Sequence, residues 1–181
     1  MARPTAAGRR YAEAAFELAS RDDALDAWGE GLALAARFAA DESVVRVVDN
    51  PSIPFADRSA AVDSLLGTRV PESVRNLARL LASRGRFETL PAVAAEYHRL
   101  LNRQRGIVEA VVTSAQPLTA DETAALQARV ESMTGAGVEL RSEIDESLIG
   151  GLTVRVGDQL LDASVRGRLE RLRDQLVRGA R

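Results

Sequence analysis

The hydrophobic period of this 181-residue chain changes once, at Gly106, and that change limits what the chain can fold into. Across residues 6–105 apolar side chains recur at the 3.6-residue spacing of amphipathic helices. Across residues 108–112 the period becomes two, as in a strand with one buried face. The pattern predicts an α+β protein with a helical domain at residues 1–105 and a mixed domain at residues 106–181.

Turn residues divide the helical half into six segments joined by short connections. Pro54 and Pro71 stand where helices begin, because a first-turn residue needs no N–H donor, and Gly67 follows the end of another helix. Asp22 or Asp23 can cap the second helix. We therefore predict a compact six-helix bundle.

The second half is predicted to hold four short strands and two helices. Thr119 and Glu122 fit a capping box at the start of the first of these helices. Residues 152–156 alternate in polarity, and Gly157-Asp158 suits a two-residue hairpin turn. Four apolar residues of the last helix are expected to face the sheet: Val165, Leu169, Leu172 and Leu176.

The first helix, about Thr5–Ser20, has more apolar surface than a bundle requires. Arg10, Glu13 and Glu17 lie on one narrow polar stripe, and apolar residues fill much of the remaining arc. Two interpretations remain open from the residues alone. The alanines allow close approach of neighbouring helices, or one edge of the helix receives a helix from another chain.

Composition argues against catalysis. The chain has no cysteine, and all 24 of its basic residues are arginine, which removes thiolate chemistry and a phosphate-loop or Schiff-base lysine. His98 is the only histidine, so no histidine pair can bind a metal, and we expect an ordinary surface or groove-edge residue there. We predict no catalytic, cofactor-binding or metal-binding residues.

Charge and hydropathy also argue against nucleic acid and membrane insertion. The net charge is −2, and from Gly106 onward 9 arginines stand against 12 acidic residues, without stacking aromatics. No run of about 18 apolar residues exists, and no signal peptide is recognisable. These features predict a soluble cytoplasmic protein.

Three motifs, in the right order along nearly the whole chain, resemble the delta subunit of bacterial F-type ATP synthases, the homologue of the mitochondrial oligomycin-sensitivity-conferring protein. The most specific is the segment Ile144–Leu169, with its Gly150-Gly151 pair and its Ser164–Leu169 run. The others are Arg10–Phe16 and Arg84–Gly85–Arg86 before Leu90-Pro91.

The resemblance implies a non-catalytic stator subunit that links the peripheral stalk to the catalytic head, so that the head resists rotor torque. It implies two partners, the N-terminal helix of an alpha subunit for the bundle and the C-terminal helices of the b subunits for the second domain. It also implies a peripheral position at the cytoplasmic face of the bacterial plasma membrane, without direct membrane insertion. A generic helix-binding adaptor of another multi-subunit assembly is the alternative.

By position, the resemblance places the alpha-binding groove between the first and fifth helices, with tryptophan close by. A peptide helix in such a groove is anchored by side chains one turn apart. The residues carried over are Tyr11, Ala14, Ala15, Leu18, Trp28, Leu77, Ala78 and Leu81.

Overall fold

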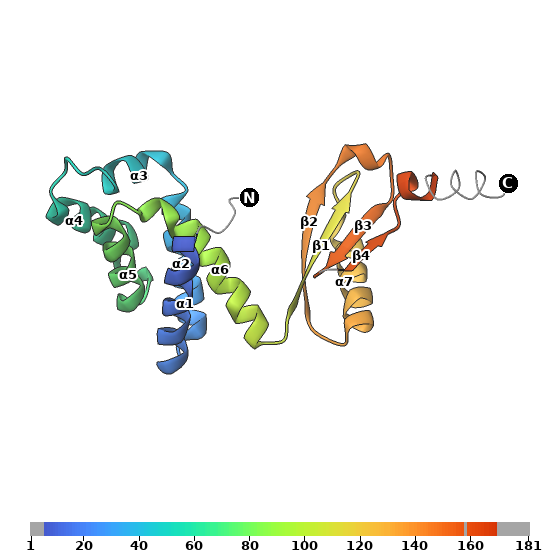
Figure 1. Ribbon diagram of the computed structural model, residues 1–181, viewed down its shortest axis with the longest axis horizontal. Coiled ribbons are helices and arrows are strands. Elements are labelled where there is room, and N and C mark those ends of the chain that lie inside the picture. The colour runs from blue at the N-terminus through green and yellow to red at the C-terminus, as the bar shows by residue number, and fades with distance from the viewer. Residues whose placement is uncertain (1–5, 158, 170–181) are drawn as a thin grey trace. The chain divides into compact units, whose positions relative to one another are not determined.

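The computed structural model describes residues 6–157 and 159–169, and it confirms a mixed fold of helices and a four-stranded sheet. The chain divides into two compact units, Met1–Leu101 and Asn102–Arg181 (Figure 1). Each unit has its own hydrophobic core. In the described part of the chain, no helix combines the length and apolar character that a membrane span requires.

The first unit is helical, with a core of alanine, valine and leucine around Trp28, Phe87 and Tyr97. These three aromatic side chains are at most 2% exposed. The elements are α1 (Ala6–Arg21), α2 (Leu25–Ala39), α3 (Glu42–Val48), α4 (Phe55–Leu66), η1 (Gly67–Arg69), α5 (Glu72–Ser83), η2 (Phe87–Thr89) and α6 (Leu90–Gln104).

Local chemistry sets most helix ends. Pro54 and Pro71 precede α4 and α5, and Gly67 ends α4 at a φ of 54°, as expected from the sequence. The predicted aspartate cap of α2 is wrong: its N-cap is Ala24, which makes no side-chain bond. Asp23 instead occupies the left-handed region at a φ of 50°, which reverses the chain between α1 and α2.

Two polar side chains join elements far apart in the first unit. The buried guanidinium of Arg58 donates from Nη1 to the carbonyl oxygens of Val48 at 3.2 Å and Ala82 at 2.7 Å. The carboxylate of Asp49 accepts the backbone N–H of Phe87 at 2.8 Å, which satisfies a donor at the start of η2. These bonds fix α3, α4 and α5 around one another.

The second unit contains a sheet with strand order β2-β1-β3-β4, and a helix packs on one face of it (Figure 1). The β1 and β2 strands are parallel, and α7 makes the crossover between them, whereas the other pairs are antiparallel. The elements are β1 (Val108–Ser114), α7 (Ala120–Thr134), β2 (Val138–Ile144), η3 (Glu146–Leu148), β3 (Leu152–Val156) and β4 (Gln159–Asp162).

The α7 helix covers the apolar face of this sheet. Val112 of β1 stands opposite Val154 of β3, and both pack in one buried cluster with Val130 of α7. The predicted capping box is present, since Glu122 accepts the N–H of Thr119 at 2.9 Å and donates its own N–H to the Thr119 hydroxyl at 3.3 Å.

The end of α6 belongs to the second unit. Gly106 has a φ of 66°, and the N–H of Ile107 donates to the carbonyl of Asn102 at 2.9 Å, which closes the last turn of the helix. The Asn102 side-chain amide also donates to the Glu139 carboxylate on β2. The compact unit therefore begins at Asn102, a few residues before the boundary at residues 105 and 106 expected from the change of period.

The expectation that the last helix turns its apolar side onto the sheet is wrong for its first turn. Val165 is 39% exposed and Leu169 is 55% exposed, because Ser164 and Gly167 are the buried residues at the start of this helix. Leu172 and Leu176, which are expected to continue the same face, lie outside the described residues.

Candidate partner-binding surfaces

The α1 helix packs against the rest of the helical unit along a ridge of small residues. Gly8, Ala12, Ala15 and Ala19 recur at helical spacing, and all four are buried. Small side chains let helix backbones approach closely, so α1 sits tightly on its neighbours with little side-chain volume between them. This ridge divides the rest of α1 into two flanks.

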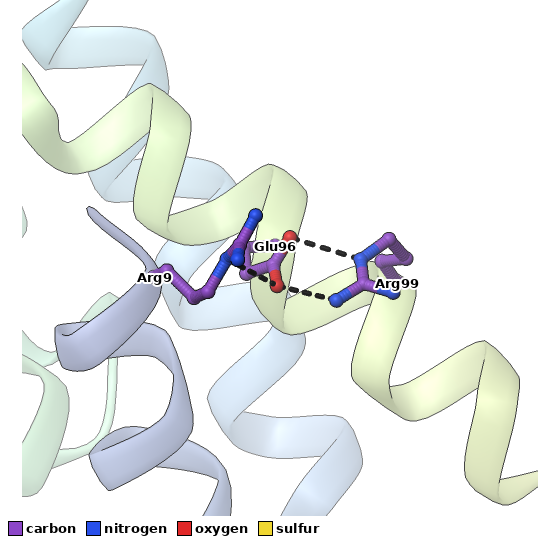
Figure 2. Close-up of polar contacts among 3 residues, drawn as sticks. All are labelled: Arg9, Glu96 and Arg99. Atoms are coloured by element: carbon purple, nitrogen blue, oxygen red, sulfur yellow. Dashed lines mark hydrogen bonds and ion pairs between the residues drawn. The ribbon is translucent and has the colours of Figure 1, made fainter. Parts of the chain in front are cut away.

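One flank of α1 faces α6 through a polar and an aromatic contact. The carboxylate of Glu96, which is 4% exposed, accepts two hydrogen bonds from Arg99, one turn further along α6. Arg9 of α1 reaches the same carboxylate at 3.7 Å, as Figure 2 shows. The rings of Phe16 and Tyr97 meet edge to face at 5.6 Å. This flank of α1 therefore packs against α6.

The opposite flank of α1 carries three of the residues predicted to bind a partner. At 100° per residue, Tyr11, Ala14 and Leu18 lie on the far side of the buried ridge from Phe16. Tyr11 is half-buried, Ala14 is exposed and Leu18 is 41% exposed. Their spacing is that of one helix face, so α1 presents an apolar strip that α6 does not cover.

The α5 helix has the same two-sided arrangement. Arg79 pairs with Asp63 of α4, with 2.8 Å between Nε and Oδ1, so this flank faces α4. Leu77 and Leu80 lie on the other flank, half-buried and 44% exposed respectively. Leu80 is not among the residues that the resemblance places in the groove, although its position three residues after Leu77 puts it on the same helix face.

The other four predicted residues lie in the core of the helical unit. Ala15, Trp28, Ala78 and Leu81 are each at most 2% exposed and belong to one cluster. The α2 helix, which carries Trp28, packs against both α1 and α5. The buried set therefore lies beneath the two apolar strips. Of the eight predicted residues, those within reach of another chain are Tyr11, Ala14, Leu18 and Leu77.

In the second unit, the Gly150-Gly151 segment and the run from Asp162 to Gly167 interlock. The N–H of Val165 donates to the carbonyl of Gly150 at 2.9 Å. The Asp162 carboxylate accepts the backbone N–H of Ser164 at 2.9 Å and its hydroxyl at 2.6 Å. The Ser164 hydroxyl oxygen accepts the N–H of Gly167 at 3.0 Å, which caps the helix start. The motif Ile144–Leu169 thus holds the residues before strand β3 against the start of the last helix.

The carboxylates with perturbed pKa values serve as caps. A hydrogen bond from the Ser43 side chain lowers the pKa of Asp41, and the Thr119 backbone N–H lowers the pKa of Glu122. Ser147, with help from Arg166, lowers the pKa of Asp145. Within residues 6–157 and 159–169, no group of three or more metal-ligating side chains gathers. His98 lies on the exposed side of α6.

Large apolar side chains stand exposed on both units, and exposed apolar surface of this kind is typical of subunits that work within a larger assembly. The family model described as "ATP synthase delta (OSCP) subunit" matches residues 7–176. The chain belongs to the ATP synthase delta (OSCP) subunit family, whose members are non-catalytic structural subunits of that complex.

Two relatives and one solved structure are similar to this chain along nearly its full length. The ATP synthase subunit delta of Methylobacillus flagellatus is 39% identical over 172 residues, covering 95% of this chain and 97% of the relative. That of Thioalkalivibrio sulfidiphilus is 39% identical over 181 residues, covering 98% and 100%. A chain of the Toxoplasma gondii mitochondrial ATP synthase hexamer superposes with a TM-score of 0.68 at 26% identity, covering 96% and 98%.

Proposed function

We propose that this subunit links the peripheral stalk of a proton-translocating F-type ATP synthase to its catalytic head and so holds the head against rotor torque. The observation that carries the proposal is the pair of apolar strips on α1 and α5, backed by a shared core and left open on the flanks away from α6 and α4. Membership of the ATP synthase delta (OSCP) subunit family identifies the complex whose other subunits would cover these strips.

The partner proposed for the first unit is the N-terminal helix of an alpha subunit. An amphipathic helix presents apolar side chains at positions i, i+3, i+4 and i+7, which matches the spacing of Tyr11, Ala14 and Leu18. Burying a leucine fully is worth about 1.5–3 kcal/mol. Nanomolar affinity requires about 12 kcal/mol net of association costs, so several such contacts along both strips are needed.

The partner proposed for the second unit is the C-terminal end of the b subunits of the stalk. Seven of the eleven large apolar residues that stand exposed in the described part of the chain belong to this unit. Exposed apolar residues at this density mark surfaces that other chains cover. Bound in this way between head and stalk, the subunit would lie peripherally at the cytoplasmic face of the bacterial plasma membrane.

Reconstitution of heads that lack their own copy of the subunit tests this function. Full-length protein is expected to bind such heads at one copy each, and a peptide from the alpha N-terminus is expected to compete with it. Soluble b subunit is expected to bind the same protein without displacing the head. Failure of both partners to bind would leave an adaptor of some other assembly as the function.

A further inference from the structure

Gly31 of α2 lets the start of α5 lie very close to α2. A Cβ placed on Gly31 would stand 3.1 Å from Cδ of Pro71 and 3.2 Å from Cγ2 of Val74. Carbon atoms in favourable contact are about 3.5–4.0 Å apart. Even the methyl group of alanine would therefore push these neighbours away by a few tenths of an ångström. The missing side chain of Gly31 sets the distance between the two helices.

Backbone conformation does not explain this glycine. Gly31 lies in the interior of α2 and is not among the residues with a positive φ. Glycine in a helix interior is less favourable than alanine, because it loses more conformational freedom on folding. Gly31 thus weakens the helix that contains it, and what it provides is the close position of α5.

The α5 helix is hydrogen-bonded to α4 at both ends, so a push from α2 displaces the helix as a whole. Near its N-terminal end, Nη1 of Arg75 donates to the carbonyl of Gly67, at the end of α4, at 2.8 Å. At its C-terminal end, the carbonyl of Ala82 accepts the bond from Arg58 of α4 at 2.7 Å. Bending of α5 alone would stretch one of these bonds.

The apolar strip on α5 follows directly from the point of contact with α2. Val74 lies one turn before Leu77, and Leu80 continues the strip. The α2 helix packs against α1 as well as α5, so it carries both helices whose strips are open to a partner. A displacement of α5 at Gly31 therefore changes the spacing between the two strips.

We propose that Gly31 is a positioning residue for partner binding, because it holds the strips on α1 and α5 at the spacing that one partner helix can span. The inference rests on the proposed function, in which that partner is the N-terminal helix of an alpha subunit. A helix that binds both strips must touch them at the same time. Apolar contacts weaken when a gap of only part of an ångström opens between the surfaces.

The test compares Gly31→Ala with Gly29→Ala, a matched control in the same helix. A Cβ on Gly29 would meet Tyr97 at 3.7 Å and Leu101 at 3.9 Å, which are ordinary contact distances to α6, and nothing of α5 lies within 4 Å. Both variants gain the higher helix propensity of alanine. The melting temperature is expected to rise by a few degrees in Gly29→Ala and to stay within a few degrees in Gly31→Ala, where crowding offsets that gain.

Binding is measured with catalytic heads that lack their own copy of the subunit and with a peptide from the alpha N-terminus. Affinity for both is expected to fall about fivefold or more in Gly31→Ala, and to stay within about twofold in Gly29→Ala. Soluble b subunit, the partner proposed for the second unit, is expected to bind the unmodified protein and both variants equally.

Each outcome decides the inference. Unchanged head and peptide affinity of Gly31→Ala would overturn it, and so would an equal loss in Gly29→Ala, which would show a general effect of changing α2. A large fall in the melting temperature of Gly31→Ala that accompanies its loss of binding would assign Gly31 to stability and would also overturn it. If the unmodified protein binds neither the heads nor the peptide, the proposed head-binding function fails, and the inference fails with it.

Discussion

Gly151 lies so close to Ala163 that a Cβ placed on it would stand 2.6 Å from the carbonyl oxygen of Ala163. The residue that precedes strand β3 and the approach to the last helix thus touch backbone to backbone. Because Gly151 also has a φ of 76°, any side chain there meets both a contact and a conformational penalty.

Gly151→Ala is therefore expected to destabilise the second unit by about 2–4 kcal/mol, the sum of strain and overpacking. Gly157→Ala is the matched control, since Gly157 has a φ of 57° but no atom within 4 Å of the position that a Cβ would take. It should lose only about 1 kcal/mol. Hydrogen exchange of the β1 and β3 amides measures the loss of stability in each variant. Equal losses in Gly151→Ala and Gly157→Ala would contradict the close contact of Gly151 with Ala163.

Ala14→Asp tests the strip on α1. Ala14 is exposed in the free protein, so the variant should fold with an unchanged melting temperature, whereas the bound state would bury an unpaired carboxylate at a cost of several kcal/mol. Affinity for the catalytic head is expected to fall by at least about a hundredfold. Ala33→Asp, at an exposed position of α2, is the control. Retained head binding by Ala14→Asp would rule out this strip as the docking surface.

Glu96 is expected to stabilise the contact between α1 and α6. Glu96→Ala removes a buried carboxylate that accepts two bonds from Arg99, at an expected cost of about 1–3 kcal/mol. Arg9→Ala should cost less than about 1 kcal/mol, because Arg9 is 57% exposed and reaches Glu96 only at 3.7 Å. Urea unfolding followed by Trp28 fluorescence reports on this unit. A larger loss of stability in Arg9→Ala than in Glu96→Ala would contradict the role of Glu96 in this contact.

The capping box of α7 makes the stability of the second unit depend on pH. Its hydrogen bonds from Thr119 lower the pKa of Glu122 below the ordinary value of 4.5. A lowered pKa in the folded state stabilises the protein above the unfolded pKa, and that contribution is lost as the pH falls through the folded value. Glu122→Gln keeps a capping side chain but cannot titrate. Melting temperatures of the two proteins should differ near pH 6 and converge below about pH 3.

The sequence was sufficient for features that local chemistry decides. The prolines before α4 and α5, the glycine after α4 and the capping box at Thr119 were all predicted, because each satisfies or removes backbone donors within a few residues. The change of hydrophobic period at Gly106 also separates the helical unit from the unit that contains the strands. Side-chain periodicity is a property of the local backbone.

Only the tertiary structure decided which apolar residues the fold covers. Leu81 and Leu18 look alike in a periodic pattern, yet the bundle buries the first and leaves 41% of the second exposed, because coverage depends on which helices pack on either flank. The same holds for Val165, expected on the sheet and found exposed, and for Glu96, whose burial requires arginines from α1 and α6. Contacts between distant segments have no local signature, so the open strips became visible only once the neighbouring helices were in place.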